Sequence, residues 1–206
     1  MHSTCVNCLL DILYNVAVME NCLYKVKNRY EFRKWLKENG KTEKECWIKL
    51  KRGKPEDPDT FYYLDAVEEA LCFGWIDSTW KTVGNKKLQR FTPRKNGPWS
   101  ELNKERVRRL EKLGLMEDEG RKVLPPMGPR SFKFDEDIIK ALKERRCYTT
   151  FKNFPPLYQR IRAYNVSFYK TKDKAIYDKA LKHLIEETEK GKMFGEWNDY
   201  GRLLKF

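Results

Sequence analysis

The stretch Leu71–Ser100, LCFGWIDSTWKTVGNKKLQRFTPRKNGPWS, carries the clearest structural signals in the chain. Gly74 ends an apolar helical pattern, and two strand-like runs follow it, residues 76–83 and 86–92. Between them lies Gly84-Asn85, a dipeptide that accepts the positive φ angles of a tight hairpin turn. The stretch therefore predicts a helix that stops at Gly74 and an antiparallel hairpin that starts directly after it.

Outside this stretch, the pattern predicts one more strand and several helices. Residues 45–51, ECWIKLK, alternate between apolar and polar side chains as a half-buried strand does. Helical spacing of apolar residues, with Asn28 and Ser100 as N-caps, predicts the helices. Their expected ranges are 29–39, 62–73, 101–113, 117–124, 135–145, 155–164 and 171–190. The expected fold is α+β: a small antiparallel sheet with its hairpin packed by helices, followed by an all-helical C-terminal unit.

Composition shifts divide the chain into five expected parts. The proline-rich run PPMGPR can be neither helix nor sheet interior, so it predicts a linker. Leu23–Val26 alternates and is read as a short edge strand that opens the α+β domain. The parts are an N-terminal extension (1–22), the α+β domain with the GWID and RFTPRK motifs (23–124), the linker (125–134), a helical C-terminal unit (135–192) and a tail that docks or frays (193–206).

The charge balance points to anionic partners. The 206 residues carry a formal net charge of +13, with 35% charged residues and a pI of about 9.4. Such a balance favours binding of nucleic acid, anionic lipid headgroups or phosphorylated molecules, and it argues against direct binding of a cationic peptide. No run is long enough to span a membrane, and no export signal is visible, so a cytoplasmic location is expected.

Cysteine and histidine usage gives no metal or cofactor site. Cys5 and Cys8 form a lone C-x-x-C, whereas a zinc site needs a second pair or two histidines. The only histidines are His2 and His183, which lie far apart in the sequence. We therefore expect no metal and no cofactor.

The strongest binding candidates lie in a basic segment from Lys81 to Lys112. It holds eleven basic and three acidic residues, a local balance of +8. Arginine supplies fork-shaped donors for anions, and aromatic rings among basic residues can stack nucleic-acid bases. The anion-binding candidates are Arg90, Arg94, Lys95, Lys81, Trp80, Trp99 and Asp77, with Phe91 as a further ring. An ordinary solvated face with core aromatics explains the same pattern equally well.

Catalytic candidates are weaker. Asp77 follows the helix-to-strand corner and either faces Arg90 or Arg94 or ties down the corner as a structural acceptor, the reading we favour. A general acid–base pair needs a second convergent carboxylate, and Glu68 and Glu69 are expected to face solvent. Cys72 lies on an apolar helix and is read as a core cysteine; with Gly74 and Trp75 it forms a structural motif.

Several blocks of the chain resemble the YdeI/OmpD-associated family, also called the bacteriocin-protection family. They are FRKWL (32–36), AVEEALCFGWIDS (66–78), QRFTPRK (89–95), WSELNKERVRRLEKLG (99–114) and YDKALKHLIEETEKGK (177–192). The resemblance covers roughly residues 23–192 and implies a role in tolerance of bacteriocins and cationic antimicrobial peptides. It also implies an envelope association, from which this chain departs because it shows no export signal.

These observations favour a non-enzymatic basic protein of stress or peptide tolerance, with an anion-binding groove near the 76–99 hairpin. A single-strand nucleic-acid-binding regulator and an enzyme of unknown reaction are the alternatives. The expected partners are an anionic ligand or polyanion, or nucleic acid, with an envelope partner left open.

Overall fold

The computed structural model describes residues 26–128 and 131–206, which divide into two compact units. The first unit contains residues 26–97 and 114–123; the second contains residues 98–113 and continues from Leu124 to Phe206. This division differs from a linker at 125–134, because residues 98–113 group with the C-terminal helices. The expected N-terminal extension, most of the Leu23–Val26 strand and residues 129–130 of the linker lie outside the described residues.

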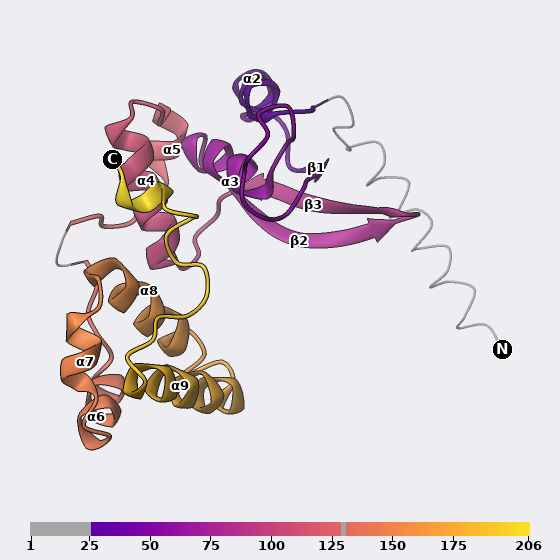
Figure 1. Cartoon of the computed structure of the whole chain (residues 1–206). Coiled ribbons are helices and arrows are strands. Elements are labelled where there is room, and N and C mark those ends of the chain that lie inside the picture. Colours follow the sequence, from indigo (N-terminus) through magenta and orange to yellow (C-terminus); the bar gives the residue numbers. More distant parts are fainter. Residues whose placement is uncertain (1–25, 129–130) are drawn as a thin grey trace. The chain divides into compact units, whose positions relative to one another are not determined.

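The first unit is a three-stranded antiparallel sheet with helices (Figure 1). Its elements are α2 (Arg29–Asn39), β1 (Cys46–Lys49), α3 (Tyr63–Cys72), β2 (Trp75–Val83), β3 (Lys86–Pro93) and α5 (Asp118–Lys122). The strand order is β1-β3-β2, so the second strand of the hairpin lies in the centre. The expected hairpin is confirmed, since β2 ends at Val83 and β3 begins at Lys86 on either side of the Gly84-Asn85 turn.

The sheet register decides which side chains share a face. Directly opposed residues lie on one face, and neighbours along a strand lie on opposite faces. Arg90 of β3 pairs with Trp47, whereas Gln89 pairs with Trp80 across the hairpin. An irregularity in β2 between Asp77 and Trp80 changes the register there, as a β-bulge does. The bulge puts Asp77 and Trp80 on the same face although they are three residues apart.

Aromatic side chains form the core of the first unit where α2 meets the sheet. The ring of Phe32 lies 5.5 Å from that of Phe91 and 5.7 Å from that of Phe61. Trp35 meets Trp75 edge to face at 5.7 Å. Such tilted and edge-to-face contacts are favoured by the quadrupoles of the rings. They fix α2 against the strands that carry the candidate site.

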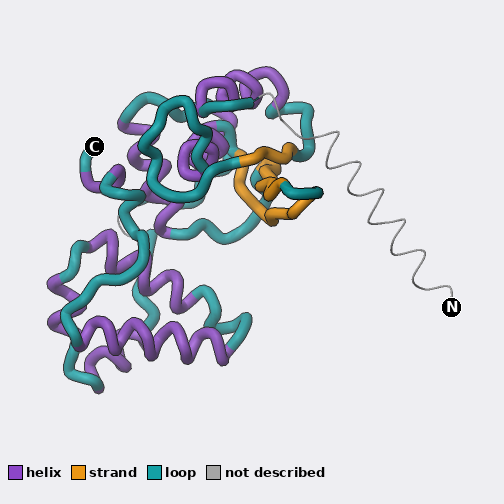
Figure 2. The backbone as a smooth tube through the Cα atoms, turned by 45° about the vertical axis from the view of Figure 1, so that its right-hand side comes forward, coloured by secondary structure: helices purple, strands orange, loops and turns teal. Residues whose placement is uncertain are grey.

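The second unit consists of helices and loops (Figure 2). Its elements are α4 (Glu101–Lys112), α6 (Glu136–Glu144), α7 (Tyr148–Asn153), α8 (Pro156–Ser167), α9 (Lys174–Glu189) and a short 3₁₀ helix (Arg202–Leu204). The cap Ser100 accepts a hydrogen bond from the backbone N–H of Asn103, as its position before α4 predicts. The short helix α7 has no counterpart among the expected elements, because a six-residue segment offers too little periodicity.

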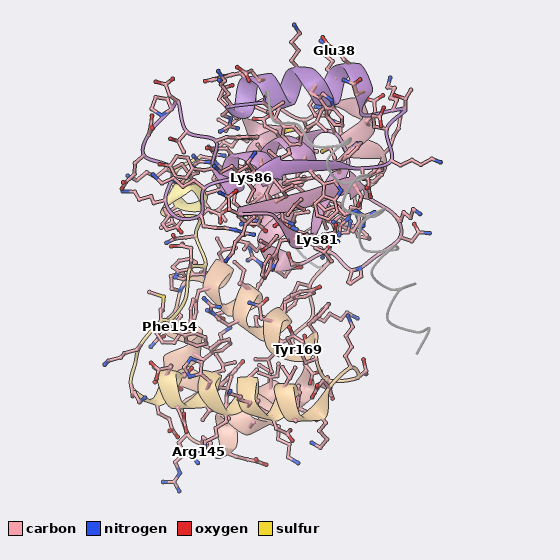
Figure 3. The ribbon with its side chains drawn as sticks, turned by 90° about the vertical axis from the view of Figure 1, so that its right-hand side faces the viewer. Glu38, Lys81, Lys86, Arg145, Phe154 and Tyr169 are labelled. Atoms are coloured by element: carbon pink, nitrogen blue, oxygen red, sulfur yellow. The ribbon has the colours of Figure 1, made fainter. Side chains whose placement is uncertain are left out.

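Two apolar clusters hold the second unit together. One joins α6, α7, α8 and α9 through Ile138, Leu142, Phe151 and Leu184, among others. Around Tyr158 the other cluster gathers Leu157, Ile161, Trp197 and Leu203. Figure 3 labels Phe154 and Tyr169, which flank α8 before its start and after its end.

The tail after residue 192 docks within the second unit. Asp199 binds the Arg106 guanidinium of α4 through two oxygens, at 2.7 and 2.8 Å, and both side chains are buried. Bidentate pairs of this kind are among the strongest charge-assisted hydrogen bonds. The pair explains why α4 belongs with the C-terminal helices. The architecture as a whole is α+β, which confirms the predicted fold class.

Candidate functional site

The corner between α3 and β2 fixes the base of the hairpin. Gly74 has a φ of +73°, a conformation that residues with a side chain rarely adopt. Its carbonyl accepts a 2.8 Å hydrogen bond from the N–H of Arg94, and Trp75 donates its indole N–H to the carbonyl of Gly40 at 3.1 Å. The side chains of Trp75 and Arg94 are buried. Among the described residues, Arg94 is therefore part of the corner rather than an exposed anion ligand.

Arg90 lies on the sheet face that it shares with Leu88 and Trp47. Its guanidinium is about one third exposed and forms an ion pair with Glu45, to which Nε donates at 2.6 Å. Glu45 comes from the loop before β1, forty-five residues away in sequence. The strand face was predictable from spacing, but the carboxylate partner was not.

An open hollow lies beside Arg90, and we call it the Arg90 hollow. It has a volume of about 960 Å³ and is bounded by the 41–45 segment after α2, the start of β2 and the end of β3. Its basic lining residues are Lys41, Lys44, Arg90 and Lys95, and its acidic ones are Glu43 and Glu45. Lys41 pairs with Glu119 at 2.8 Å, and this contact raises the Lys41 pKa. Lys44 and Lys95 form no ion pair with any residue from 26–128 or 131–206.

Asp77 does not face Arg90. It lies opposite Phe91, so it occupies the other face of the sheet. Its carboxylate accepts a 2.6 Å hydrogen bond from the hydroxyl of Tyr63, the first residue of α3. Asp77 therefore ties the start of α3 to β2, which agrees with the structural reading that we favoured.

The expected aromatic platform reduces to one ring. Trp80 is 60% exposed, with the Lys87 ammonium 5.3 Å from its ring centre. Phe91 is fully buried, and Trp99 is buried and belongs to the second unit. Of the three rings considered as stacking platforms, only Trp80 is exposed, because alternation along β3 turns Phe91 into the core.

Lys81 lies on the Arg90 face of the sheet. It pairs with Leu88 in the register, as Lys86 pairs with Val83 near the turn, and Figure 3 labels both lysines on the hairpin. Lys81 is farther along the hairpin than Arg90 and is not among the described residues that line the Arg90 hollow.

The basic segment from Lys81 to Lys112 is divided between the two units. Residues up to Gly97 belong to the first unit, and Pro98 to Lys112 belong to the second. Several of its basic residues are paired with acids, some from outside the segment. The pairs are Arg90–Glu45, Lys104–Glu101, Arg106–Asp199 and Arg108–Glu105. A local charge count overstates the free positive charge because it cannot include Glu45 and Asp199.

A buried cluster of ion pairs on α3 was not predicted from the sequence. Glu68 is fully buried and Glu69 nearly so, which overturns the expectation that both face solvent. Glu69 accepts hydrogen bonds from Arg29 at 2.6 and 2.9 Å and from Arg33 at 2.9 Å. Asp65 adds a 3.2 Å contact to Arg29. Burial lowers the pKa of Arg29, but the carboxylates outweigh it, and the net shift is upward. The cluster joins α2 to α3.

Cys72 is a free, buried thiol at the end of α3. Burial and then the Glu69 carboxylate raise its pKa from 9.0 to about 12, despite the opposing effect of Arg33. The thiolate is the nucleophilic form of cysteine. Cys72 is therefore poorly suited to nucleophilic chemistry near neutral pH, in agreement with its reading as a core residue.

We expect Cys72 to resist alkylation in the folded protein. At about pH 9, its thiolate fraction should be several hundred-fold below that of an unfolded cysteine, because its pKa is raised by about three units. Iodoacetamide labelling, read by mass spectrometry on the peptide that carries Cys72, should be slow in buffer and fast in denaturant. The raised pKa also means that this thiol stabilises the fold fully below pH 9 and loses that contribution as the pH rises towards 12. Rapid labelling of the folded chain would contradict the assignment.

The described ranges contain no metal-binding cluster and no membrane-spanning helix. No group of three or more histidine, cysteine or acidic side chains there is placed to hold a metal ion. No helix of residues 26–128 and 131–206 has the length and apolar content needed to cross a bilayer.

Comparison with known proteins gives one family match. Residues 24–123 are similar to the family described as a domain of unknown function, DUF8412. The matched range ends at Val123, the residue that also closes the first unit. No curated protein and no solved structure matches the chain. The matched family has no assigned activity, so the match indicates no function for this chain.

Proposed function

We propose that this protein is a non-catalytic binding protein for an anionic ligand, and that the Arg90 hollow holds the ligand. The observation that carries the proposal is the pair Lys44 and Lys95. Both line the hollow, and neither forms an ion pair with a described residue. Unneutralised cations around an open concave surface raise the local concentration of anions.

Arg90 adds hydrogen-bond donors of fixed orientation to this positive charge. Its guanidinium is held by Glu45, which restricts its rotamers and leaves the rest of its donors for a ligand. An anion bound between Arg90 and Lys95 would accept hydrogen bonds from the planar guanidinium of Arg90 and from the ammonium group of Lys95. Glu43 and Glu45 also line the hollow and reduce its net positive charge.

The cellular role that we propose follows from the resemblance to the bacteriocin-protection family. A chain with a net charge of +13 repels cationic peptides. We therefore propose that it supports tolerance indirectly, through an anionic ligand or partner, and that it does so in the cytoplasm. The position of Cys72 and the Tyr63 contact of Asp77 both favour binding over catalysis.

The experiment uses inorganic polyphosphate, a polyanion without bases, and the full-length chain. Binding should weaken as salt rises, because phosphate contacts release counterions. The Lys44→Gln/Lys95→Gln variant should lose about tenfold in affinity, since it removes both free ammonium groups from the hollow. Calorimetric titration at several salt concentrations gives both results.

A matched control removes the same charge elsewhere. Lys34 and Lys182 are each exposed and contact a glutamate only loosely, at 4.0 and 3.8 Å. The Lys34→Gln/Lys182→Gln variant should keep its affinity within about twofold. If both double variants lose affinity equally, only net charge matters and the assignment of the Arg90 hollow fails.

A further inference from the structure

A second hollow lies beside Trp80 and Gln89, whose side chains are on the sheet face opposite to Arg90, and we call it the Trp80 hollow. It has a volume of about 320 Å³ and is lined by Leu50, Arg52, Trp80, Lys87, Leu88 and Gln89. All six residues belong to the first unit. Its lining combines an exposed indole, two cations and a small apolar floor.

Arg52 is held in place without being neutralised. Its guanidinium carbon lies 3.7 Å from the centre of the Tyr63 ring, and its Nη2 donates to the side-chain oxygen of Gln89 at 2.7 Å. It forms no ion pair with a carboxylate of the described chain. A stacked guanidinium retains its full charge and several free donors, and it loses little entropy when it binds an anion.

Gln89 anchors this arrangement to the hairpin. Its amide nitrogen donates to the carbonyls of Ser78 and Thr79, both at 3.1 Å, within the β2 bulge. These contacts orient its oxygen towards Arg52. The same bulge places Trp80 on the Gln89 face. One irregularity therefore positions both the guanidinium and the indole.

Trp80 supplies a flat surface beside these cations. Its side chain is 60% exposed, and Lys87 lies close to the ring. Large exposed aromatic rings flanked by basic residues are the stacking platforms of single-strand binding proteins. The hollow has roughly twice the volume of a cavity of about 150 Å³ that accommodates benzene, so it fits one base.

We propose that the Trp80 hollow binds one nucleotide, with the base stacked on Trp80 and the phosphate contacted by Arg52 and Lys87. The chemistry is shared by a free mononucleotide and by a nucleotide within a single-stranded chain. The site shares no lining residue with the Arg90 hollow, so it stands whether or not that hollow binds an anion. It also assigns a ligand role to Arg52, which the sequence did not single out.

Three small probes separate the two halves of the ligand in calorimetric titrations of the full-length protein. Adenosine monophosphate should bind at least tenfold more tightly than either adenosine or ribose 5-phosphate, because only it offers both base and phosphate. Equal affinities for adenosine monophosphate and ribose 5-phosphate would overturn the proposal, since the site would then be a plain anion site.

Substitutions at Trp80 and Arg52 test the contacts proposed for the base and the phosphate. Trp80→Ala should weaken binding of adenosine monophosphate by about tenfold or more, and Trp80→Phe should retain most of it, because stacking needs only a ring. Arg52→Lys keeps the charge but loses the fork and the stack on Tyr63, and should weaken binding several-fold. The control Tyr30→Ala removes another exposed ring of the same unit, on α2, and should leave the affinity for adenosine monophosphate unchanged. If Trp80→Ala keeps both its affinity for adenosine monophosphate and its melting temperature, the proposal is contradicted.

Binding of oligonucleotides distinguishes a free mononucleotide from a nucleotide within a single-stranded chain as the ligand. A single-stranded octamer should bind more tightly than adenosine monophosphate, and a duplex more weakly, because paired bases cannot reach Trp80. A preference for duplex contradicts stacking. Polyphosphate binding should be the same in Trp80→Ala and wild type, so failure of this site and failure of the Arg90 hollow give different results.

Discussion

Replacing Gly74 by valine is expected to lower the free energy of unfolding by about 4 kcal/mol, from backbone strain and overpacking together. A β-branched residue is strained at a φ of +73°. In addition, its Cβ would lie 2.8 Å from the carbonyl oxygen of Glu119 and 3.2 Å from the Val123 side chain. Urea unfolding followed by tryptophan fluorescence measures the change.

A second glycine separates strain from crowding. Gly84 also has a positive φ, +60°, but nothing lies within 4 Å of where its Cβ would be. Gly84→Val should therefore show the strain alone, about 2 kcal/mol. If Gly74→Val costs no more than Gly84→Val, the close approach at Glu119 has no energetic weight.

The close approach has a local cause. The N–H of Glu117 donates to the carbonyl of Cys72 at 3.0 Å, which brings the start of α5 onto the end of α3. Gly120 lies at the same crossing, and a Cβ there would be 2.2 Å from the Cys72 oxygen. The two glycines, forty-six positions apart in the numbering, thus allow two helices to cross in contact. Only Gly74 was identifiable from the sequence, because it ends a helix.

Local signals predicted the elements well. The Gly84-Asn85 turn and the caps Asn28 and Ser100 act through neighbours a few residues away, so a short window contains the information. Asn28 accepts from the N–H of Glu31 at 3.0 Å, as a cap should. The hairpin, the capped helix starts and the α+β class therefore followed from spacing and turn chemistry.

The site depended on information that no local window holds. Trp80 and Arg90 were grouped by proximity in sequence, but the β2 bulge and the strand alternation place them on opposite faces. Arg52 gains its role only from Tyr63 and Gln89, which lie eleven and thirty-seven positions further along the chain. A bulge cannot be read from composition, because it is set by the packing of both strands.

The same reason explains the error at Glu68 and Glu69. Acidic residues within a helix are normally exposed, and they become buried only when cations balance them. Those cations, Arg29 and Arg33, come from α2, forty and thirty-six residues earlier. The signal available in the sequence was the apolar surroundings of the pair in AVEEALC, which leave no polar face for them.

Replacing Glu69 by alanine is expected to cost about 4 kcal/mol of unfolding free energy, the typical loss when one member of a buried ion pair is removed. Glu69 binds both Arg29 and Arg33, and its side chain is almost fully buried. Its removal leaves two partly buried guanidinium groups with fewer partners. Glu69→Gln keeps an acceptor but not the charge, so its cost should be smaller.

The control for this cluster is Glu38→Ala on α2. Glu38 is exposed and lies 4.0 Å from Lys34, a contact that should contribute nothing measurable. Urea titrations in low salt and in about 1 M salt complete the test, because salt screens exposed pairs far more than buried ones. The loss in Glu69→Ala should persist at high salt. A loss that disappears with salt, or one no larger than that of Glu38→Ala, would mean that the cluster is a solvated surface network and not what joins α2 to α3.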